Sequence, residues 1–145
     1  MRTRSNFEHL LGSVKEDVLR LASMVDSAIG DSIKALQNRD EGLATRVSTN
    51  DANLNQLRYE IEERCYIAIA LQQPNATDLR VIVGAVSVVT NLERIGDHAA
   101  GIARLTLRML DEPPVTPLDD IVLMAESARE MVRDAVEAFI KPDVG

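Results

Sequence analysis

The sequence predicts an all-helical protein, a long antiparallel three-helix bundle followed by one further helix that begins a second, incomplete repeat. Apolar residues recur at spacings of three and four through long stretches that contain no proline. Leu, Val, Ile, Ala and Met supply most of the apolar content, whereas aromatic residues make up only 3%. This composition suits helices better than sheets. With 145 residues, 46% of them hydrophobic, the chain can bury one compact core.

The first half of the chain predicts two helices. An apolar stripe begins at Phe7 and continues to Leu36, which predicts one long amphipathic helix. The pattern breaks over residues 38–41. A second stripe then runs from Ala44 to Ala68 and stops before Pro74.

A third helix is predicted to begin after Asn75, which can serve as its N-cap. Asp78 follows three residues later, so the pair forms a capping box in which the carboxylate reaches back to the first N–H groups. The apolar stripe then extends from Ile82 to Leu110. A helix of some thirty residues would be ~50 Å long.

Prolines at 113, 114 and 117 end the third helix and mark a boundary. We therefore divide the chain into a three-helix unit (1–112), a proline-rich linker (113–117) and the first helix of a truncated second unit (118–145). Thr116 is expected to cap that helix, with Pro117 at its first position and an end near Ile140. A shift of 103 positions aligns the fourth helix with the first in helical phase, which supports an internal repeat.

Charge and composition exclude several classes of protein. Sixteen basic and 23 acidic residues give a formal charge of −7, which disfavours nucleic-acid binding. The longest nearly apolar stretch, residues 81–89, is too short to span a bilayer, and the N-terminus lacks the apolar core of a signal peptide. We expect a cytoplasmic protein. Its one cysteine, Cys65, lies on an apolar stripe and is expected to be a core residue.

Glu93 and Asp97 are the first candidate site. They are four residues apart on the third helix, so their carboxylates project from one face within ~6 Å of each other. Such a pair at a seam between helices can bind a hard cation. Alternatively, the two residues form an ordinary solvated acidic flank, with Asp97 paired to Arg94.

The second helix offers polar residues that can face the same seam. The apolar stripe passes from Val47 to Leu54, which turns Asn50 or Asp51, or both, toward the bundle interior. Either residue can hydrogen-bond across the bundle or supply an oxygen to a cation, and Asn55 can join it.

The neighbours of the acidic pair have structural interpretations. Gly96 lies on the inward side, where it permits close helix packing, and His98 lies on the outer side. Ile95 stands where a ferritin-like di-iron helix would need histidine. The chain contains no glycine-rich phosphate loop, no catalytic triad pattern and no HExxH helix. A metal-dependent hydrolase or oxidase is therefore the weakest interpretation, and we expect no enzymatic activity.

Two segments resemble the PhoU family of phosphate-signalling proteins. They are Gln72-Gln73-Pro74-Asn75-Ala76-Thr77-Asp78-Leu79-Arg80 and Leu92-Glu93-Arg94-Ile95-Gly96-Asp97. The resemblance covers about residues 7–143, including Asn50-Asp51. It implies two similar three-helix units, each with an acidic motif on its third helix that binds metal. Because this chain holds only the first helix of a second unit, the second acidic motif is absent.

The resemblance also implies ligands and partners. Glu93 and Asp97 match the metal-binding motif, and Asp51 matches the acidic position that faces it. The cofactor would be a divalent or trivalent ion, with iron, zinc, manganese or magnesium as candidates. The implied function is negative regulation of the phosphate response by linking the ATPase of the phosphate transporter to a membrane-bound sensor histidine kinase, with the protein peripheral to the membrane at most.

Two alternatives remain open from the sequence. The chain can instead be a structural bundle or oligomerisation module that binds no specific metal. The fourth helix carries an apolar stripe that must be buried either on its own unit or against another chain, which predicts a four-helix closure or a homodimer. The stripe comprises Ile121, Ala125, Ala128, Val132, Ala135 and Phe139.

Overall fold

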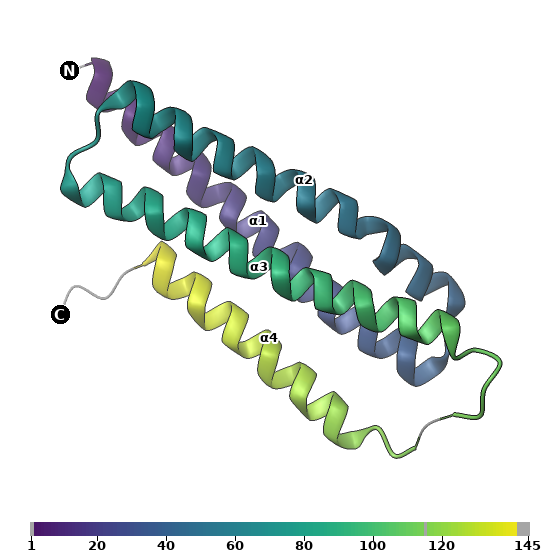
Figure 1. Cartoon of the computed structure of the whole chain (residues 1–145). Helices are drawn as coiled ribbons and strands as arrows, with labels where there is room; N and C mark the ends of the chain where they lie inside the picture. Colours follow the sequence, from purple (N-terminus) through teal and green to yellow (C-terminus); the bar gives the residue numbers. More distant parts are fainter. Residues whose placement is uncertain (1, 115, 142–145) are drawn as a thin grey trace.

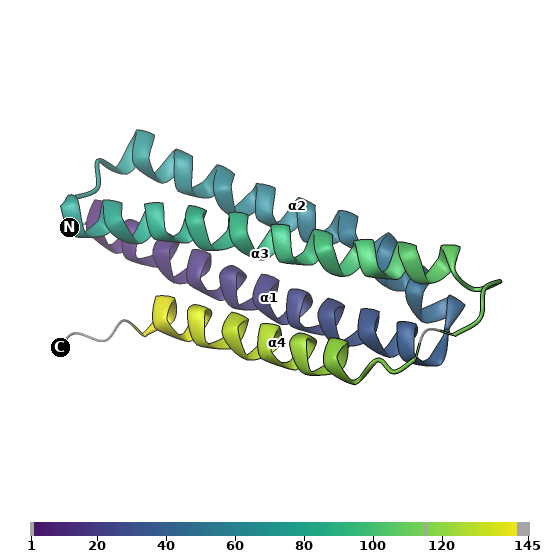
Figure 2. The same ribbon diagram turned by 60° about the horizontal axis from the view of Figure 1, so that its bottom comes forward.

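The computed structural model describes residues 2–114 and 116–141, and these form four helices without a strand. The helices are α1 (Arg2–Asn38), α2 (Glu41–Gln72), α3 (Ala76–Arg108) and α4 (Asp119–Ile140). Successive helices run in opposite directions along one common axis, and the start of α1 and the end of α4 lie at the same end of the bundle (Figures 1 and 2). The predicted all-helical fold is confirmed.

Side-chain caps fix where α2 and α3 begin. The Asp40 carboxylate accepts a hydrogen bond of 3.0 Å from the backbone N–H of Leu43, and Asn75 accepts one of 2.9 Å from the N–H of Asp78. The Asn75 cap agrees with the sequence prediction. The buried Asp78 carboxylate, however, pairs with Arg4 of α1 rather than completing a local capping box. This contact ties the first turns of α1 and α3 together.

One apolar core lies between α1, α2 and α3. Its central side chains are fully buried and come from all three helices, as the predicted stripes require. Cys65 belongs to this core, and burial raises the pKa of its thiol to about 11. The core interpretation of Cys65 is therefore confirmed. The largest fully buried apolar side chains are Leu21, Leu54, Ile61, Ile82, Val18, Val25 and Val89.

The fourth helix folds back onto the same chain and packs mainly against α1. The C-terminal end of α4 also touches α3, where Phe139 lies beside Gly84. Val132 and Val136 are buried in the main core. The four-helix closure, one of the two predicted arrangements, is thus observed. The helix begins at Asp119 rather than at Pro117, and Leu118 precedes it without a side-chain capping bond.

The predicted phase of α4 was partly wrong. Val132 is buried as expected, but Ile121 is 39% exposed and Ala135 is also exposed, whereas Val136 is buried. The reason is an ion pair that orients the helix. Arg129 donates two hydrogen bonds to Asp26 of α1, at 2.8 and 3.1 Å, and thereby turns the adjacent apolar side chains toward α1.

No helix among the described residues is both long enough and apolar enough to cross a membrane.

Candidate functional site

The three predicted site residues lie at the seam between α2 and α3. Glu93 and Asp97 project from α3, and Asp51 projects from the facing side of α2. Glu93 is half-buried and Asp97 is exposed, while the Asp51 side chain keeps only 15% of its surface accessible. The structure therefore brings together residues that the sequence separates by more than forty positions.

Gly96 allows the two helices to approach closely beside the acidic pair. A Cβ atom at this position would lie 2.7 Å from Cδ2 of Leu54 on α2 and 3.7 Å from Cγ2 of Val25 on α1. Any side chain there would force the helices apart or displace Leu54. The packing role predicted for Gly96 is confirmed, and this close approach brings Asp51 near Asp97.

The carboxylates influence one another electrostatically. Burial raises the pKa of Asp51, and the Asp97 carboxylate raises it further, against the opposing effect of Arg104. Burial and then Asp97 also raise the pKa of Glu93, and Arg58 partly offsets this effect. The seam therefore holds negative charge that the protein itself neutralises only in part.

Two arginines flank the carboxylates. Arg104 of α3 lies 3.5 Å from the Asp51 carboxylate. Arg58 of α2 pairs with Glu62 at 3.0 Å, and Glu62 also accepts a hydrogen bond of 3.1 Å from Thr90 on α3. The guanidinium groups of Arg58 and Arg104 thus flank the candidate site along the seam.

Sequence reasoning did not identify these flanking groups. Arg58 and Glu62 are four residues apart on α2, and this spacing was a usable signal for their ion pair. Arg104 pairs with Asp51 through the tertiary fold, and nothing in the local sequence indicates that contact.

The carboxylate oxygens of the site suit a hard cation, but their arrangement in this structure is not a complete binding site. Carboxylate oxygens are the ligands that Mg²⁺, Mn²⁺ and oxidised iron favour. Among residues 2–114 and 116–141, no group of three Asp, Glu, His or Cys side chains is arranged to hold a metal ion. To bind a cation together with Asp97, Asp51 would have to exchange its contact with Arg104.

The other polar residues proposed from the sequence lie outside the carboxylate cluster. Asn50 is exposed and accepts a hydrogen bond of 2.7 Å from Asn53, and Asn55 accepts one of 2.9 Å from Arg58. His98 is exposed on the outer side of α3, as predicted. Of the candidates on α2, only Asp51 is shielded at the seam.

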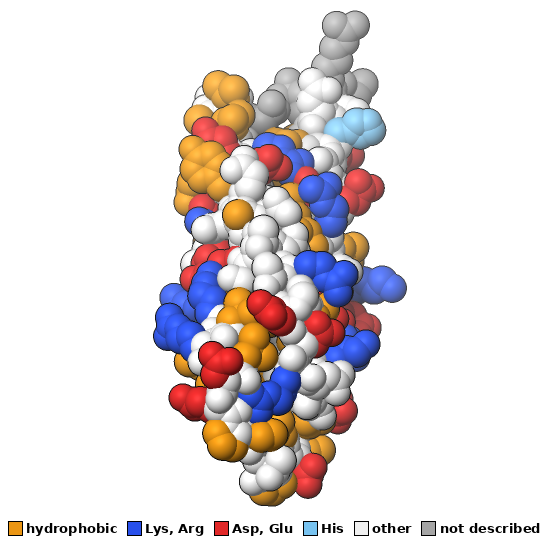
Figure 3. Space-filling model, turned by 90° about the vertical axis from the view of Figure 1, so that its right-hand side faces the viewer, with side chains coloured by type: hydrophobic (Ala, Val, Ile, Leu, Met, Phe, Trp, Pro, Cys, Tyr) orange, Lys and Arg blue, Asp and Glu red, His pale blue; other side chains and the backbone are white. Residues whose placement is uncertain are grey.

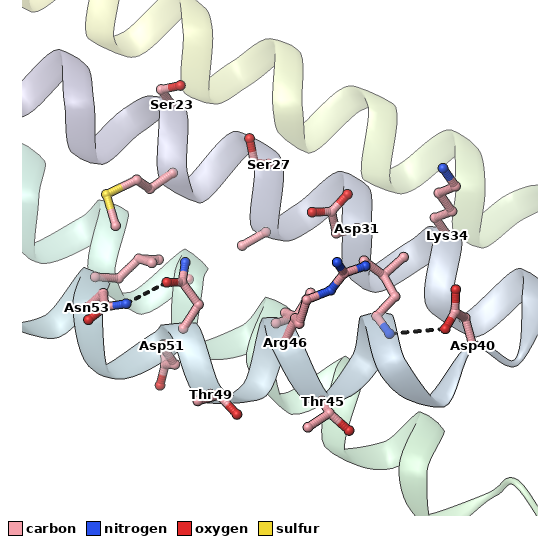
Figure 4. A pocket seen from close by; sticks show the side chains of 17 residues that line it. Ser23, Ser27, Asp31, Lys34, Asp40, Thr45, Arg46, Thr49, Asp51 and Asn53 are labelled. Atoms are coloured by element: carbon pink, nitrogen blue, oxygen red, sulfur yellow. Dashed lines mark hydrogen bonds between the residues drawn. The ribbon is translucent and has the colours of Figure 1, made fainter.

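A polar groove of about 850 Å³ lies between α1 and α2, and Gly96 of α3 also lines it. Figure 4 shows Ser23 and Ser27 on its α1 wall and Arg46 on its α2 wall, while Asp51 points away from the α1 side chains. Asp51 and Gly96 nevertheless belong to the lining of the groove, which therefore adjoins the carboxylate seam. In the view of Figure 3, acidic and basic side chains are interspersed, with no broad basic field that would attract nucleic acid.

A family model described as the PhoU domain matches residues 18–106, which include Asp51, Glu93 and Asp97. The chain belongs to the PhoU family. The resemblance inferred from its sequence motifs is confirmed.

Individual PhoU relatives match nearly the whole chain. The phosphate-specific transport system accessory protein PhoU homolog of Aquifex aeolicus is 41% identical over 133 residues, which are 92% of this chain and 60% of that protein. PhoU of Escherichia coli is 33% identical, over 95% of this chain and 57% of that protein. The chain thus spans about 60% of the length of the relatives that it matches.

Solved PhoU structures share the arrangement of the four helices. The crystal structure of PhoU from Pseudomonas aeruginosa superposes with a TM-score of 0.87 and 32% identity, covering 92% of this chain and 64% of that one. PhoU from Streptococcus pneumoniae gives a TM-score of 0.82 at 30% identity, covering 91% and 62%. The position of α4 against α1 is therefore part of a fold shared with these proteins.

Proposed function

We propose that this PhoU-family chain is an accessory protein of a phosphate transport system and a negative regulator of the phosphate response. In this proposal it links the ATPase of the transporter to a sensor histidine kinase, on the cytoplasmic side of the membrane. The observation that carries the proposal is the 41% identity to a phosphate-specific transport system accessory protein over 92% of the chain. An accessory rather than catalytic role agrees with the names of these relatives.

Deletion of the gene in the native host tests the regulatory proposal. A phosphate-starvation reporter should become active in phosphate-rich medium after deletion and return to its low level when the 145-residue chain is supplied. Co-purification should recover the transporter ATPase and the kinase. An unchanged reporter in the deletion strain would contradict the proposed function.

We further propose that Asp51, Glu93 and Asp97 bind a divalent or trivalent cation. Their mutual repulsion supports this, because a bound cation would relieve the effect of Asp97 that raises the pKa of Asp51 and of Glu93. The cation would take the place of Arg104 beside Asp51. Iron, zinc, manganese and magnesium are the candidates.

Elemental analysis of the purified protein tests the cation site. The double substitution Glu93→Ala with Asp97→Ala should lower the metal content and abolish any rise in melting temperature on addition of the ion. The matched control is Glu130→Ala with Asp134→Ala, an exposed acidic pair with the same four-residue spacing on α4. Equal metal content in wild type and both variants would rule out the site.

A structural role without a specific metal is the second candidate function. The Arg104 contact with Asp51 and the Arg58 pair with Glu62 favour it, because the chain's own cations already occupy part of the seam. In that role the protein would serve as a helical scaffold or oligomerisation module. We propose a homodimer as the assembled form for either function.

A further inference from the structure

The outward side of α3 carries a row of residues that recurs every seven positions, in which arginine alternates with a small residue. Seven residues make almost two full helical turns, so these positions lie nearly in a straight line along the helix, over ~42 Å. The arginines and the serine are exposed, and the glycine is half-buried. We call this the outer row of α3: Arg80, Ser87, Arg94, Gly101 and Arg108.

The arginines of the outer row differ from most others in the protein because no carboxylate neutralises them. Arginines on each of the four helices form ion pairs with Asp or Glu side chains of this chain. In the part of the chain that the structure describes, no ion pair includes Arg80, Arg94 or Arg108. The pairing of Arg94 with Asp97 that the sequence allowed does not form. Three positive charges are therefore unopposed in a chain whose formal charge is −7.

Apolar rather than acidic side chains accompany the row. Val83 and Leu105, on the same side of α3, are 55% and 52% exposed. Of the acidic residues of the helix, Asp78 is buried at the first turn, and Glu93 and Asp97 lie toward the seam with α2. The outward side of α3 is therefore both cationic and apolar.

The surface is hollowed at the glycine of the row, where a depression has a volume of about 530 Å³. No atom lies within 4 Å of the position that a Cβ would take at Gly101. Arg104, Leu105 and Arg108 line the depression, and Asp97 supplies the one carboxylate among its lining residues. It can accept an apolar side chain on Leu105 with a carboxylate beside it, within reach of the guanidinium groups.

The spacing of the row indicates that a helix is the element that fits it. In a partner helix that packs lengthwise on α3, side chains also recur every seven residues, so carboxylates can meet successive arginines ~21 Å apart. Ser87 and Gly101, between the arginines, leave room for larger side chains of that helix. Apolar residues beside its carboxylates would cover Val83 and Leu105.

A broad anionic surface fits this side of α3 less well than a single helix does. Nucleic acid or an anionic membrane would extend past the row to the carboxylate seam, where Glu93 and Asp97 would repel it. A helix is only about 10 Å wide, so it can contact the row without covering the seam. Charge complementarity therefore favours an acidic helix.

We infer that the outer row of α3 binds an acidic amphipathic helix of a partner protein. The inference assigns a contact surface within the proposed regulatory function, and it rests on that function for the existence of such a partner. It does not depend on the cation site.

Binding of a designed helical peptide to the 145-residue chain tests the surface. The patterned peptide, of about 30 residues to match the row, carries glutamate at every seventh position with leucine beside it. A shuffled peptide of the same composition and vesicles of phosphatidylglycerol are measured in parallel. By fluorescence anisotropy, the chain should bind the patterned peptide more tightly than the shuffled one, and the difference should diminish as salt is raised.

Charge-neutralising variants locate the binding surface. Arg80→Gln with Arg108→Gln should weaken binding of the patterned peptide about fivefold, because two exposed ion pairs are lost. The matched control is Arg20→Gln with Arg46→Gln, which removes the same charge from exposed arginines of α1 and α2. It should change the affinity by less than about twofold. Circular dichroism should be unchanged in both variants.

The same variants in the natural gene of the native host connect the surface with regulation. Arg80→Gln with Arg108→Gln should activate the phosphate-starvation reporter in phosphate-rich medium, as deletion should, and the control variant should not. The reversal Arg80→Glu should be compensated by a lysine substitution at an acidic residue of a second protein, because this restores the opposite charges.

Equal affinity for the two peptides, or equal binding by the row and control variants, overturns the helix partner. Row-dependent binding to the vesicles but not to the peptide assigns the row to a lipid surface instead. A compensating substitution within the same reading frame shows that the row makes an internal contact, which also overturns the partner. If deletion leaves the reporter inactive, the proposed function fails, and the peptide result still decides the surface.

Discussion

Gly96 determines how closely α2 and α3 approach at the carboxylate seam. Replacing it with alanine would place a methyl group 2.7 Å from the tip of the buried Leu54 side chain. Overpacking of this kind costs about 1 to 3 kcal/mol, and the better helix propensity of alanine offsets up to ~1 kcal/mol of it. We expect Gly96→Ala to lower the free energy of unfolding by about 1 kcal/mol, measured by urea denaturation.

Gly101 supplies the matched control on the same helix. No atom lies within 4 Å of the position that its Cβ would take, so Gly101→Ala gains helix propensity without a clash. This variant should be more stable than wild type by about 0.5 to 1 kcal/mol. Equal stability of the two alanine variants would show that the close approach at Gly96 has no energetic consequence.

The pKa of Glu93 gives the seam a dependence on pH that can be worked out in sign. Because burial and the nearby Asp97 raise the pKa of Glu93 in the folded state, its ionised form destabilises the fold. The destabilisation is complete above the raised pKa and diminishes as pH falls through it. With divalent ions chelated, Glu93→Gln should raise the free energy of unfolding at pH 7 by about 0.5 to 1 kcal/mol.

The advantage of Glu93→Gln should disappear as the pH approaches 4, where the wild-type side chain is also neutral. Glu130→Gln, at an exposed position of α4, serves as the control and should change stability by no more than about 0.5 kcal/mol at either pH. A Glu93→Gln variant less stable than wild type at pH 7 would contradict the repulsion inferred at the seam.

For single residues, the sequence identified the acidic side chains of the seam but not their surroundings. Helical spacing placed Glu93 and Asp97 on one face, and the family motif added Asp51. Burial raises the pKa of Asp51, the Asp97 carboxylate on the facing helix raises it further, and Arg104 opposes the rise. Such effects arise from tertiary distances of a few ångströms, which local periodicity does not encode.

Among the helices, α4 depends on the fewest contacts for its position. Arg129 anchors α4 to Asp26 of α1. The guanidinium group of Arg129 also lies over Gly30, where a Cβ atom would be 2.7 Å from Nη1 and would collide with it. The Arg129 contact lowers the pKa of Asp26, so this pair stabilises the fold above the ordinary Asp pKa and loses that effect as pH falls through the lowered value.

Arg129→Met should therefore loosen α4 while leaving the other helices in place. A charge-assisted bidentate contact contributes about 1.5 to 3 kcal/mol, so amide hydrogen exchange in α4 should accelerate roughly tenfold or more. Arg133→Met is the control, because Arg133 is 62% exposed and makes a single contact of 3.3 Å with Asp26. If both variants exchange as slowly as wild type, the ion pair does not hold the helix.

The sequence predicted where the helices lie better than it predicted which face of α4 is buried. Proline positions, N-cap residues and long apolar stripes determined the extents of the first three helices closely. The apolar residues of α4 spread around more than one side, so periodicity alone could not choose the buried face. The buried face is the one on which Arg129 pairs with Asp26, 103 residues earlier in the chain. This separation of 103 residues equals the shift that aligns the fourth helix with the first, so Asp26 and Arg129 occupy corresponding positions in the two copies of the internal repeat.

For the whole molecule, the predicted division at residues 112 and 118 can be compared with the packing. Val132 and Val136 of α4 belong to the same apolar cluster as Leu21, Ile61 and Val89 of the first three helices. Continuity of the core favours unfolding of all four helices as one unit. The sequence could mark the linker, but it could not show that the core crosses it.

The full chain should therefore unfold in a single transition when followed by circular dichroism and calorimetry. A chain of residues 1–112 should still fold, since most of the core lies within α1, α2 and α3, but should be less stable by about 3 kcal/mol or more. Removing two buried valines withdraws about 1.5 to 3 kcal/mol each, and Asp26 also loses its partner. Two separate transitions in the full chain would instead show that α4 folds independently, and the predicted boundary would then also divide the protein energetically.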